Sequence, residues 1–366
     1  MKISNETASF FSNYVLDYYS NRKFNEIGKE PNAVVIKPTL KCVANCKHCE
    51  GRLKDFESKN LLEINEYISF FKDLVDLGCK YLCISGGEPL IYKDLLKLVD
   101  VATQLGLIVS INTNGWLLDN EKLNSLLKNG VLQVNLSLDS PDSDMHDSLR
   151  GLCGLFNKVT NLFYTYNQKR EYDYILNIRM ILSKYSYRKL PEMIDLAIYL
   201  NADILSIDMI ENDYNCKEFL LNEEDIYTFN KVEKGRIFRK IETILNDNKL
   251  RKAALEQIQC IYDTNFNSES NYANGIYWPD ENIKNKCTIP LSFMILEGDG
   301  SILPCNNVEY TRRPIVGNLK QQSIKQIWNN ENWNIFRKDK DIYCRFCPMN
   351  MSHSIILRNK RVYRDI

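Results

Sequence analysis

The sequence lacks an excess of charge of either sign, because 47 Lys and Arg residues balance 47 Asp and Glu residues. A balanced chain gives no reason to expect a nucleic acid or an anionic membrane as its partner. It also lacks any uninterrupted apolar run of about 18 residues, the length that begins to span a bilayer. The N-terminal segment MKISNETASFFSNYVLDYYS has no basic stretch followed by an apolar run, so no signal peptide is expected. These absences favour a cytoplasmic protein.

Cysteine, in contrast, is plentiful, with 12 residues in a chain of 366. Thiols stay reduced in the cytoplasm, so clustered cysteines there bind metal more often than they form disulfides. The remaining composition, 44% hydrophobic and 26% charged, is ordinary for a globular protein. A chain of this length can bury one large core and carry a smaller appended unit.

Short β-like runs alternate with amphipathic stretches from residue 33 onward. The expected strands are Ala33–Lys37, Tyr81–Ile84, Leu107–Thr113, Val131–Ser137, Tyr174–Leu182 and Ile204–Met209. The expected helices are Glu63–Leu77, a helix from Leu95 that ends at Gly106, Glu121–Lys128, the largely helical stretch Asp142–Asn167, and Pro191–Leu200. This alternation implies parallel strands joined by right-handed crossovers. Six units are too few for a closed eight-stranded barrel, so the α/β fold expected is an open, partial (β/α)6 barrel.

The alternation stops near residue 212, which sets the expected domain boundaries. Residues 1–32 are expected to form an N-terminal helical extension, residues 33–212 the partial barrel, and residues 213–286 a helical linker and loop. Residues 287–366 are expected to form a small α+β domain with strands at Ser292–Leu296 and Ser301–Leu303. Ser323 and Gln326 form a capping-box pattern that opens one helix in this domain.

Three cysteines, Cys42, Cys46 and Cys49, follow the first strand at C-x3-C-x2-C spacing. Three thiolates on one tight loop can hold three irons of a [4Fe–4S] cube and leave the fourth iron open for a small molecule. A structural zinc loop with His48 as fourth ligand is the alternative, although His48 directly precedes Cys49, which makes ligation by both awkward. The number of ligands favours the iron–sulfur cluster and leaves zinc open.

Polar groups also follow the next three strands. Ser85-Gly86-Gly87-Glu88-Pro89 ends the second strand; its glycines let a ligand approach the backbone, and Glu88 can accept a hydrogen bond from an ammonium group. Thr113-Asn114-Gly115 ends the third strand and Ser137-Leu138-Asp139 the fourth. The carboxyl ends of parallel strands meet at one edge, where active sites gather. Taken alone, the Gly-Gly turn is equally an ordinary βα turn.

With the cysteine motif and the Gly-Gly-Glu-Pro motif in this order, the sequence resembles the radical SAM superfamily. In that family the open iron binds S-adenosylmethionine (SAM), and the cleaved SAM gives a 5′-deoxyadenosyl radical that takes a hydrogen from the substrate. The resemblance implies that SAM is bound by His48 near the adenine, by Ser85, Gly86, Gly87 and Glu88 around the methionine ammonium, by Asn114, and by Ser137 and Arg150 at the carboxylate and ribose. For Ser137 and Arg150 the alternative stays open that the first caps a strand and the second lies on a solvated helix.

A second set of cysteines lies nearer the C-terminus, at Cys287, Cys305, Cys344 and Cys347. Two separated pairs suit a closed four-ligand site, and spacing alone slightly favours zinc. With the Gly317–Asn329 stretch, the segment resembles the auxiliary-cluster domain of the SPASM and twitch subfamilies, and its cysteine pattern is similar to that of the aminocyclitol dehydrogenase of butirosin biosynthesis. The resemblance implies one auxiliary [4Fe–4S] cluster in a twitch-like domain, because no cysteine follows Cys347.

The resemblance implies a radical SAM oxidoreductase that receives its electron from a flavodoxin- or ferredoxin-type donor and whose auxiliary cluster accepts an electron from the substrate radical. Only 32 residues precede the first strand. They are too few for the leader-recognition domain that many peptide-modifying relatives carry, which favours a small substrate: a sugar, an aminocyclitol or a nucleoside. A maturase of a ribosomally made peptide or protein is the alternative, and a non-catalytic metal-binding protein is the second. Arg179 and Asp208 are candidates for the substrate pocket, and no catalytic acid or base is assigned.

Overall fold

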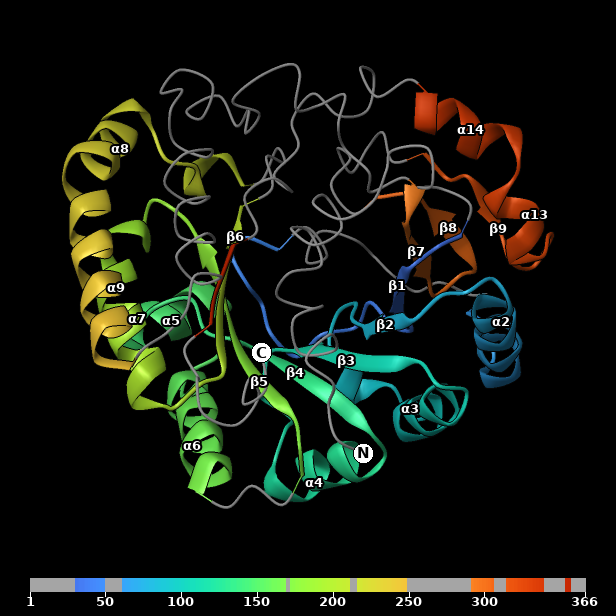
Figure 1. Cartoon of the computed structure of the whole chain (residues 1–366), viewed down its shortest axis with the longest axis horizontal. Coiled ribbons are helices and arrows are strands. Elements are labelled where there is room, and N and C mark those ends of the chain that lie inside the picture. The colour runs from blue at the N-terminus through green and yellow to red at the C-terminus, as the bar shows by residue number, and fades with distance from the viewer. Residues whose placement is uncertain are drawn as a thin grey trace.

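The computed structural model describes residues 30–49, 61–168, 172–210, 216–248, 291–305, 314–338 and 353–356. The strands in these ranges form one ten-stranded sheet in the order β10-β6-β5-β4-β3-β2-β1-β7-β8-β9. Figure 1 shows the sheet curving through the middle of the molecule, with the helices arranged around its outer side. The fold is therefore an α/β fold with a mostly parallel sheet, which confirms the fold class expected from the sequence.

The central strands are parallel and follow the order of the chain. They are β1 (Ala33–Lys37), β2 (Tyr81–Ile84), β3 (Ile108–Thr113), β4 (Val131–Ser137), β5 (Ile175–Leu182) and β6 (Ile204–Met209). Each pairs in parallel with the next one; Val35 lies beside Cys83, for example, and Asn135 beside Asn177. The carboxyl ends of all six strands therefore meet at one edge of the sheet, where the predicted motifs follow them.

The C-terminal strands extend this sheet at both ends. β7 (Phe293–Glu297) pairs in parallel with β1, and Lys37 Nζ lies 3.1 Å from Glu297 Oε1 across this pair. β8 (Ser301–Leu303) and β9 (Gly317–Asn318) continue the sheet in antiparallel fashion, and β10 (His353–Ile356) pairs antiparallel with β6. The sequence predicts strands near residues 292 and 301 but not that they join the barrel sheet, because periodicity identifies a strand without identifying its partner.

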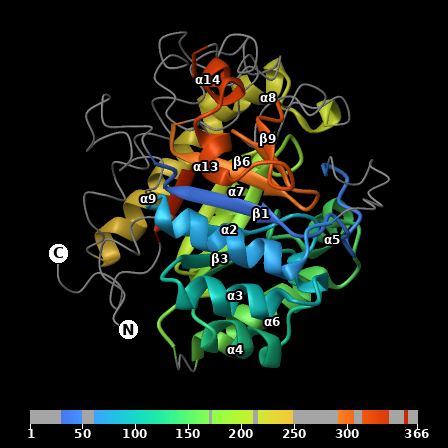
Figure 2. The ribbon, with the colours of Figure 1, turned by 90° about the vertical axis from the view of Figure 1, so that its right-hand side faces the viewer.

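Helices cover the outer face of the sheet. Those of the barrel are α2 (Ile64–Asp76), α3 (Leu95–Gln104), α4 (Asn120–Lys128), α5 (Ser143–Arg150), α6 (Leu155–Gln168) and α7 (Leu190–Tyr199), with short 3-10 turns at Pro89–Ile91, Tyr187–Lys189 and Lys217–Phe219. After β6 follow α8 (Glu223–Thr228), a π-helical turn at Phe229–Glu233 and α9 (Lys234–Asn248); after β9 follow α13 (Ile324–Trp328) and α14 (Glu331–Lys338). Figure 2 shows α2, α3 and α4 one below another on this outer side. None of the helices in the described ranges is long and apolar enough to cross a membrane.

The hydrophobic core lies between the sheet and these helices. Outward-pointing strand residues such as Ile36 and Leu82 are completely buried, as are Phe71 on α2 and Leu98 on α3. Burying one side chain of this size contributes about 2–3 kcal/mol relative to leaving it in water. Because strand side chains alternate between the two faces, the neighbouring residues on each strand point inward, and many of them are polar.

Most predicted elements agree with the structure to within one or two residues. The stretch Asp142–Asn167 is two helices, α5 and α6, because Gly151 and Gly154 between them take positive φ angles of 64° and 82°. The helix expected after Ser323 is α13, with its capping box to Gln326 in place, and the structure adds α14. The domain boundaries stay a prediction, and residues 1–29 and 249–290 lie outside the described ranges.

Candidate functional site

Cys42, Cys46 and Cys49 lie on the loop that leaves the carboxyl end of β1. Cys46 is buried, whereas Cys42 and Cys49 are exposed. Burial raises the pKa of the Cys46 thiol to about 11, and the charges of the Cys49 and Cys42 thiolates contribute to this rise. The three sulfurs are thus close enough to act on one another electrostatically. A metal that binds here must release the thiol protons, because the thiolate is the ligand.

The middle of this loop is fixed to the end of α5. The Asn45 N–H donates to the carbonyl oxygen of Arg150 at 3.2 Å, and the Lys47 N–H donates to that of Leu149 at 2.9 Å. Gly151 ends the helix in a left-handed conformation, and a Cβ atom there would lie 2.5 Å from the carbonyl oxygen of Asn45. The loop therefore needs a glycine at this position in order to reach the helix end.

The start of the loop is fixed by Gly86 and Gly87 after β2. A Cβ atom on Gly86 would lie 2.3 Å from the carbonyl oxygen of Thr39, and one on Gly87 would lie 2.2 Å from that of Lys41. The Gly87 N–H donates to Thr39 O and the Glu88 N–H to Lys41 O, at 2.9 and 2.8 Å. The sequence predicts that these glycines admit a ligand to the backbone; in the structure it is the chain's own cysteine loop that occupies the space and accepts the two N–H groups.

Glu88 is completely buried and joins the ends of β2 and β3. Its Oε1 accepts hydrogen bonds from Thr113 Oγ1 at 2.7 Å and from the Leu90 N–H at 3.1 Å, and its Oε2 accepts one from the Asn114 N–H at 2.9 Å. Burial raises the pKa of Glu88, and the bonds from Thr113 and Asn114 oppose this rise. A carboxylate has about four lone-pair sites, of which these hydrogen bonds use three, and binding of an ammonium group by Glu88 stays a prediction.

Asn114 connects the end of β3 to the cysteine loop. Its Nδ2 lies 3.6 Å from Cys42 Sγ, while its Oδ1 accepts the Trp116 N–H at 2.8 Å. The Ala44 N–H also donates to Cys42 Sγ, at 3.4 Å. Cys42 is exposed, yet its sulfur accepts contacts from two N–H groups.

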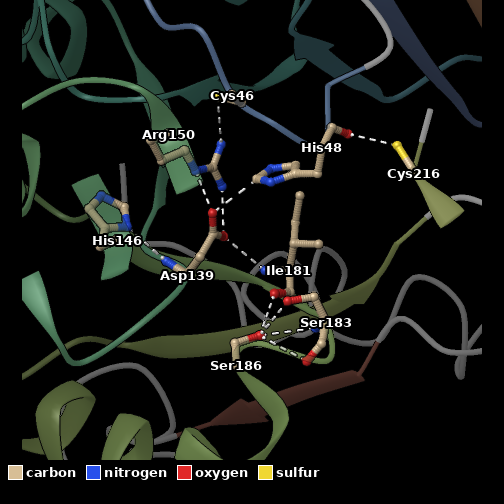
Figure 3. A network of polar contacts seen from close by, with 9 residues as sticks. All are labelled: Cys46, His48, Asp139, His146, Arg150, Ile181, Ser183, Ser186 and Cys216. Carbon is tan, nitrogen blue, oxygen red and sulfur yellow. Dashed lines mark hydrogen bonds and ion pairs between the residues drawn. The ribbon is translucent and has the colours of Figure 1, made fainter. Parts of the chain in front are cut away.

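Arg150 is buried in a bidentate ion pair with Asp139 (Figure 3). Arg150 Nε lies 2.5 Å from Asp139 Oδ2, and Nη2 lies 2.7 Å from Oδ1. The remaining nitrogen, Nη1, lies 3.9 Å from Cys46 Sγ. The Ile181 N–H on β5 donates to the same carboxylate at 3.0 Å. Arg150 is therefore not on a solvated helix face; it joins the end of β4, the end of α5 and the cysteine loop.

Two histidines lie beside Asp139, one at its backbone and one at its carboxylate (Figure 3). The Asp139 N–H donates to His146 Nδ1 at 3.1 Å, and His48 Nε2 lies 3.9 Å from Asp139 Oδ2. Burial lowers the pKa of His146 to about 4, so His146 is a neutral acceptor at pH 7. Burial by itself would raise the pKa of Asp139, but the charges of Arg150 and His48 outweigh it and lower the pKa to about 2. Cys216 donates from its Sγ to the carbonyl oxygen of His48 at 3.3 Å, so it holds this loop from the side of β6.

A row of polar side chains crosses the inward face of the sheet. Asn112 Nδ2 donates to Ser85 Oγ at 3.2 Å, and Asn135 Nδ2 donates to Asn112 Oδ1 at 2.7 Å. Asn177 Nδ2 donates to Asn135 Oδ1 at 2.7 Å and to Ser206 Oγ at 2.9 Å. The row therefore runs from β2 to β6 without interruption. Closed eight-stranded barrels are filled by branched apolar side chains, whereas this open sheet has a polar inward face that is suited to a hydrogen-bonding ligand.

Ser137 and the two substrate-pocket candidates lie at the carboxyl end of this face. Ser137 is half-buried at the end of β4 and lies beside Arg179 on β5 in the strand register. Arg179 forms an ion pair with Asp208 on β6. The charge of Asp208 raises the pKa of Arg179, which keeps the guanidinium charged. The structure therefore places these three residues together on the inward face, as the alternation of the strands predicts.

The second cysteine site is described only in part. Cys305 is buried just after β8, whereas Cys287, Cys344 and Cys347 lie outside the described residues. Nothing about the geometry of this site follows from Cys305 alone, so the four-cysteine ligand set stays a prediction.

The residues of the first site fit an iron–sulfur cluster. The donors are three thiols on one loop, the soft ligands that such clusters take, and N–H groups point at two of the sulfurs. Within the described ranges, no three His, Cys, Asp or Glu side chains converge closely enough to hold a single metal ion. A cube does not require that convergence, because each thiolate binds a different iron. The cysteine loop therefore suits the cluster that the sequence predicts.

The sequence places Thr113 and Asp139 at polar strand ends but predicts neither the bond of Thr113 to Glu88 nor the ion pair of Asp139 with Arg150, and it does not predict the row of amides. Nothing in the spacing of Asp139 to Arg150 indicates an ion pair. A signal for the row does exist: Asn112, Asn135 and Asn177 each lie within a strand, and each strand has a further polar residue two positions away. Asn and Gln are depleted in strands, so their repetition at the same face is a usable sign of a polar interior.

Two family models match the chain. The model described as the radical SAM superfamily matches residues 36–197, and the SPASM model, described as an iron–sulfur cluster-binding domain, matches residues 287–348. Together the matched segments make up more than half of the chain. They contain every cysteine proposed above as a ligand, which supports two separate cluster sites.

Named relatives agree with these models. The chain is 24% identical over 322 residues to an AdoMet-dependent heme synthase of Methanosarcina barkeri, an alignment that covers 85% of each protein. It is 29% identical over 181 residues to a PqqA peptide cyclase of Rhodopseudomonas palustris, covering 50% of this chain and 47% of that relative. The chain thus matches about half of this second protein.

A solved structure shares the fold. Streptococcus suis SuiB bound to the precursor peptide SuiA superposes with a TM-score of 0.62 at 19% identity, covering 86% of this chain and 68% of SuiB. At this identity the likeness concerns the fold alone.

Proposed function

Because the chain belongs to the radical SAM superfamily and carries a C-terminal iron–sulfur cluster-binding domain, we propose that it cleaves SAM and uses the radical formed to modify a peptide. The observation that carries the proposal is the loop of Cys42, Cys46 and Cys49 at the edge where the polar ends of β2, β3 and β4 meet. When bound, the cofactors would supply the chemistry: a [4Fe–4S] cluster held by Cys42, Cys46 and Cys49 would provide the electron that cleaves SAM, and the auxiliary cluster would provide an acceptor for the electron that the substrate loses.

The residues of the chain hold and orient these groups. Cys42, Cys46 and Cys49 ligate the first cluster, and Glu88 offers its remaining lone pair to the ammonium of SAM. Ser85 and Ser137 lie at strand ends on the inward face, where their hydroxyls can bind the polar groups of SAM. His48, Gly86 and Gly87 shape the loop beside them. Cys287, Cys305, Cys344 and Cys347 are the proposed ligands of the auxiliary cluster.

A peptide substrate is supported by the names of similar proteins and by the polar inward face. The peptide cyclase of R. palustris is named for a peptide substrate, and SuiB is described with a precursor peptide. The amide row of Asn112, Asn135 and Asn177 and the Arg179–Asp208 ion pair make this face polar, although these groups largely bond to one another. These similarities support the maturase, the alternative drawn from the sequence, better than oxidation of a sugar, aminocyclitol or nucleoside.

A tetrapyrrole is the second candidate substrate. The alignment to the heme synthase covers 85% of both chains, which is more than the alignment to the peptide cyclase. The inward face argues for the peptide instead, because hydrogen-bonding side chains rather than an apolar slot line the sheet from β2 to β6.

Anaerobic reconstitution tests the proposal directly. We expect about eight irons per chain, as two [4Fe–4S] clusters require, and formation of 5′-deoxyadenosine when SAM and dithionite are added. Peptides encoded beside the gene are then offered as substrates and analysed by mass spectrometry for loss of hydrogen. Consumption of an iron porphyrin, with no peptide modified, would favour the second candidate. Bound zinc and no cleavage of SAM would overturn the enzyme.

A further inference from the structure

Asn114 and Arg150, which the resemblance assigns to SAM, each direct an N–H group at a cysteine sulfur. Asn114 Nδ2 lies 3.6 Å from Cys42 Sγ, and Arg150 Nη1 lies 3.9 Å from Cys46 Sγ. We propose that both are positioning residues of the first cluster, whose N–H···S contacts hold two of its thiolates and raise its reduction potential. The inference rests on the proposed function, because it takes a cluster at these cysteines as given.

The orientation of the Asn114 amide is fixed by its other contacts. Its Oδ1 accepts the Trp116 N–H at 2.8 Å, and a backbone N–H can bond only to the oxygen of the amide. The backbone N–H of Asn114 is itself held by Glu88 Oε2 at 2.9 Å. The NH2 group must therefore face Cys42, and it has no freedom to turn toward another acceptor without breaking the turn.

The guanidinium of Arg150 is fixed even more firmly. Two of its nitrogens are used by Asp139, whose carboxylate also accepts the Ile181 N–H, so the pair is anchored to β5. Only Nη1 is left, and it faces Cys46. Both members of the pair are buried, Asp139 to 1% and Arg150 to 8% exposure, which leaves little solvent to screen their charges.

The Arg150–Asp139 ion pair has a definite orientation relative to the cysteine loop. The positive end of the Arg150–Asp139 pair points to Cys46, and the negative end points away, to β5. Hydrogen bonds to cluster sulfurs and nearby positive charge both stabilise the reduced, more negative state of an iron–sulfur cluster. Removing the donors should therefore make the first cluster harder to reduce, whereas neutralising Asp139 alone should make it easier.

The test compares variants that leave no buried charge unpaired with one that does. Asn114→Ser keeps a hydroxyl that can accept the Trp116 N–H but removes the donor to Cys42. The double variant Asp139→Asn with Arg150→Gln replaces the buried ion pair by two neutral amides and withdraws the donor from Cys46, which a shorter side chain cannot reach. Asp139→Asn alone keeps the guanidinium but removes its counter-charge.

Midpoint potentials are measured by EPR-monitored titration of the reconstituted full chain, with the first cluster identified by its response to SAM. For Asn114→Ser and for the double variant, we expect the equilibrium constant for reduction to fall about twofold to tenfold, the range expected for one hydrogen bond. For Asp139→Asn alone we expect a rise. Opposite signs distinguish the electrostatic role from a merely structural one, since loosening of the site would shift all three variants in the same direction.

Binding of SAM to the oxidised cluster is the second readout, and Asn129→Ser just after α4 and Arg236→Gln on α9 are the matched controls. Iron content and the ultraviolet–visible spectrum establish that each protein is loaded. An unchanged potential in the Asn114 and double variants, with weakened binding of SAM, would overturn the inference and return both residues to the SAM site. If the unmodified protein holds no cluster at all, the proposed function itself fails.

Discussion

Gly151 lies directly against Asn45, so closely that a Cβ atom on the glycine would stand 2.5 Å from the asparagine carbonyl oxygen. The contact joins the end of α5 to the middle of the loop that carries the three cysteines. The position of Cys46 therefore depends on a residue that lies about a hundred positions further along the chain.

Replacing Gly151 with alanine should disturb this loop. The new methyl group meets backbone rather than a flexible side chain, and the positive φ of 64° adds strain for any other residue. We expect Gly151→Ala to lose much of the iron of the first cluster, measured as iron and sulfide per chain. Gly154→Ala is the matched control, because Gly154 has a φ of 82° but no atom within 4 Å of a built Cβ. Equal iron content in the two variants would contradict the contact.

Glu88 should stabilise the fold independently of any cofactor. Glu88→Gln replaces one acceptor oxygen by an NH2 group, which then faces an N–H or O–H donor. We expect a loss of about 1–3 kcal/mol in the free energy of unfolding, because a buried group is left without its partner. Urea unfolding of the cluster-free chain measures this loss. Thr113→Ser, which keeps both the donor to Glu88 and the acceptor of the Gly115 N–H, should cost less; the reverse order would argue against Glu88 as the centre of this network.

Substitutions in the two cysteine groups should abolish different steps of the reaction. Cys46→Ala removes a ligand of the first cluster, so formation of 5′-deoxyadenosine should stop. Cys344→Ala should spare some cleavage of SAM but block modification of the substrate, since it affects the auxiliary cluster. Chromatographic assay of 5′-deoxyadenosine and mass spectrometry of the substrate separate these effects. Cys153→Ala, at an exposed cysteine outside both groups, serves as the control. Normal turnover by the Cys344 variant would refute the electron-acceptor role of the auxiliary cluster.

Asp139 should give the cluster-free chain a stability that depends on pH. Its pKa is lowered from 3.8 to about 2, so the folded state favours the ionised carboxylate. The stabilisation is fully present above pH 3.8 and is lost as the pH falls toward 2. A shift of this size corresponds to about 2 kcal/mol. Wild type and Asp139→Asn should therefore differ most in unfolding free energy near pH 7 and converge near pH 2. A difference that stays constant over this range would show that the ion pair does not stabilise the ionised carboxylate of Asp139.

The sequence predicts the elements and motifs that follow a regular spacing of residues. Strand and helix periods identify β1 to β6 and the helices between them, and the spacing of Cys42, Cys46 and Cys49 identifies the cluster loop. What it does not predict are contacts between elements. Asp139 and Arg150 are 11 residues apart on different elements, and no period relates an acid at a strand end to a base at a helix end.

The Gly86-Gly87 turn shows, for a single turn, the same inability of the sequence to predict contacts between elements. The presence of Gly86 and Gly87 predicts a close approach to the backbone, and a close approach is what the structure has. The sequence cannot say what approaches, because a ligand and a loop of the same chain require the same absence of a side chain.

The pairing of β1 with β7 has a consequence for how this protein folds during synthesis. Lys37 and Glu297 are 260 residues apart, so at about 5–20 residues per second β1 waits about 13–50 s on the ribosome before its second neighbour is synthesised. During that interval the strand next to the cysteine loop is an open edge, which can pair with other chains. A cluster inserted into the nascent chain would bind before this sheet is complete. We therefore expect the cluster to be inserted after the chain has left the ribosome.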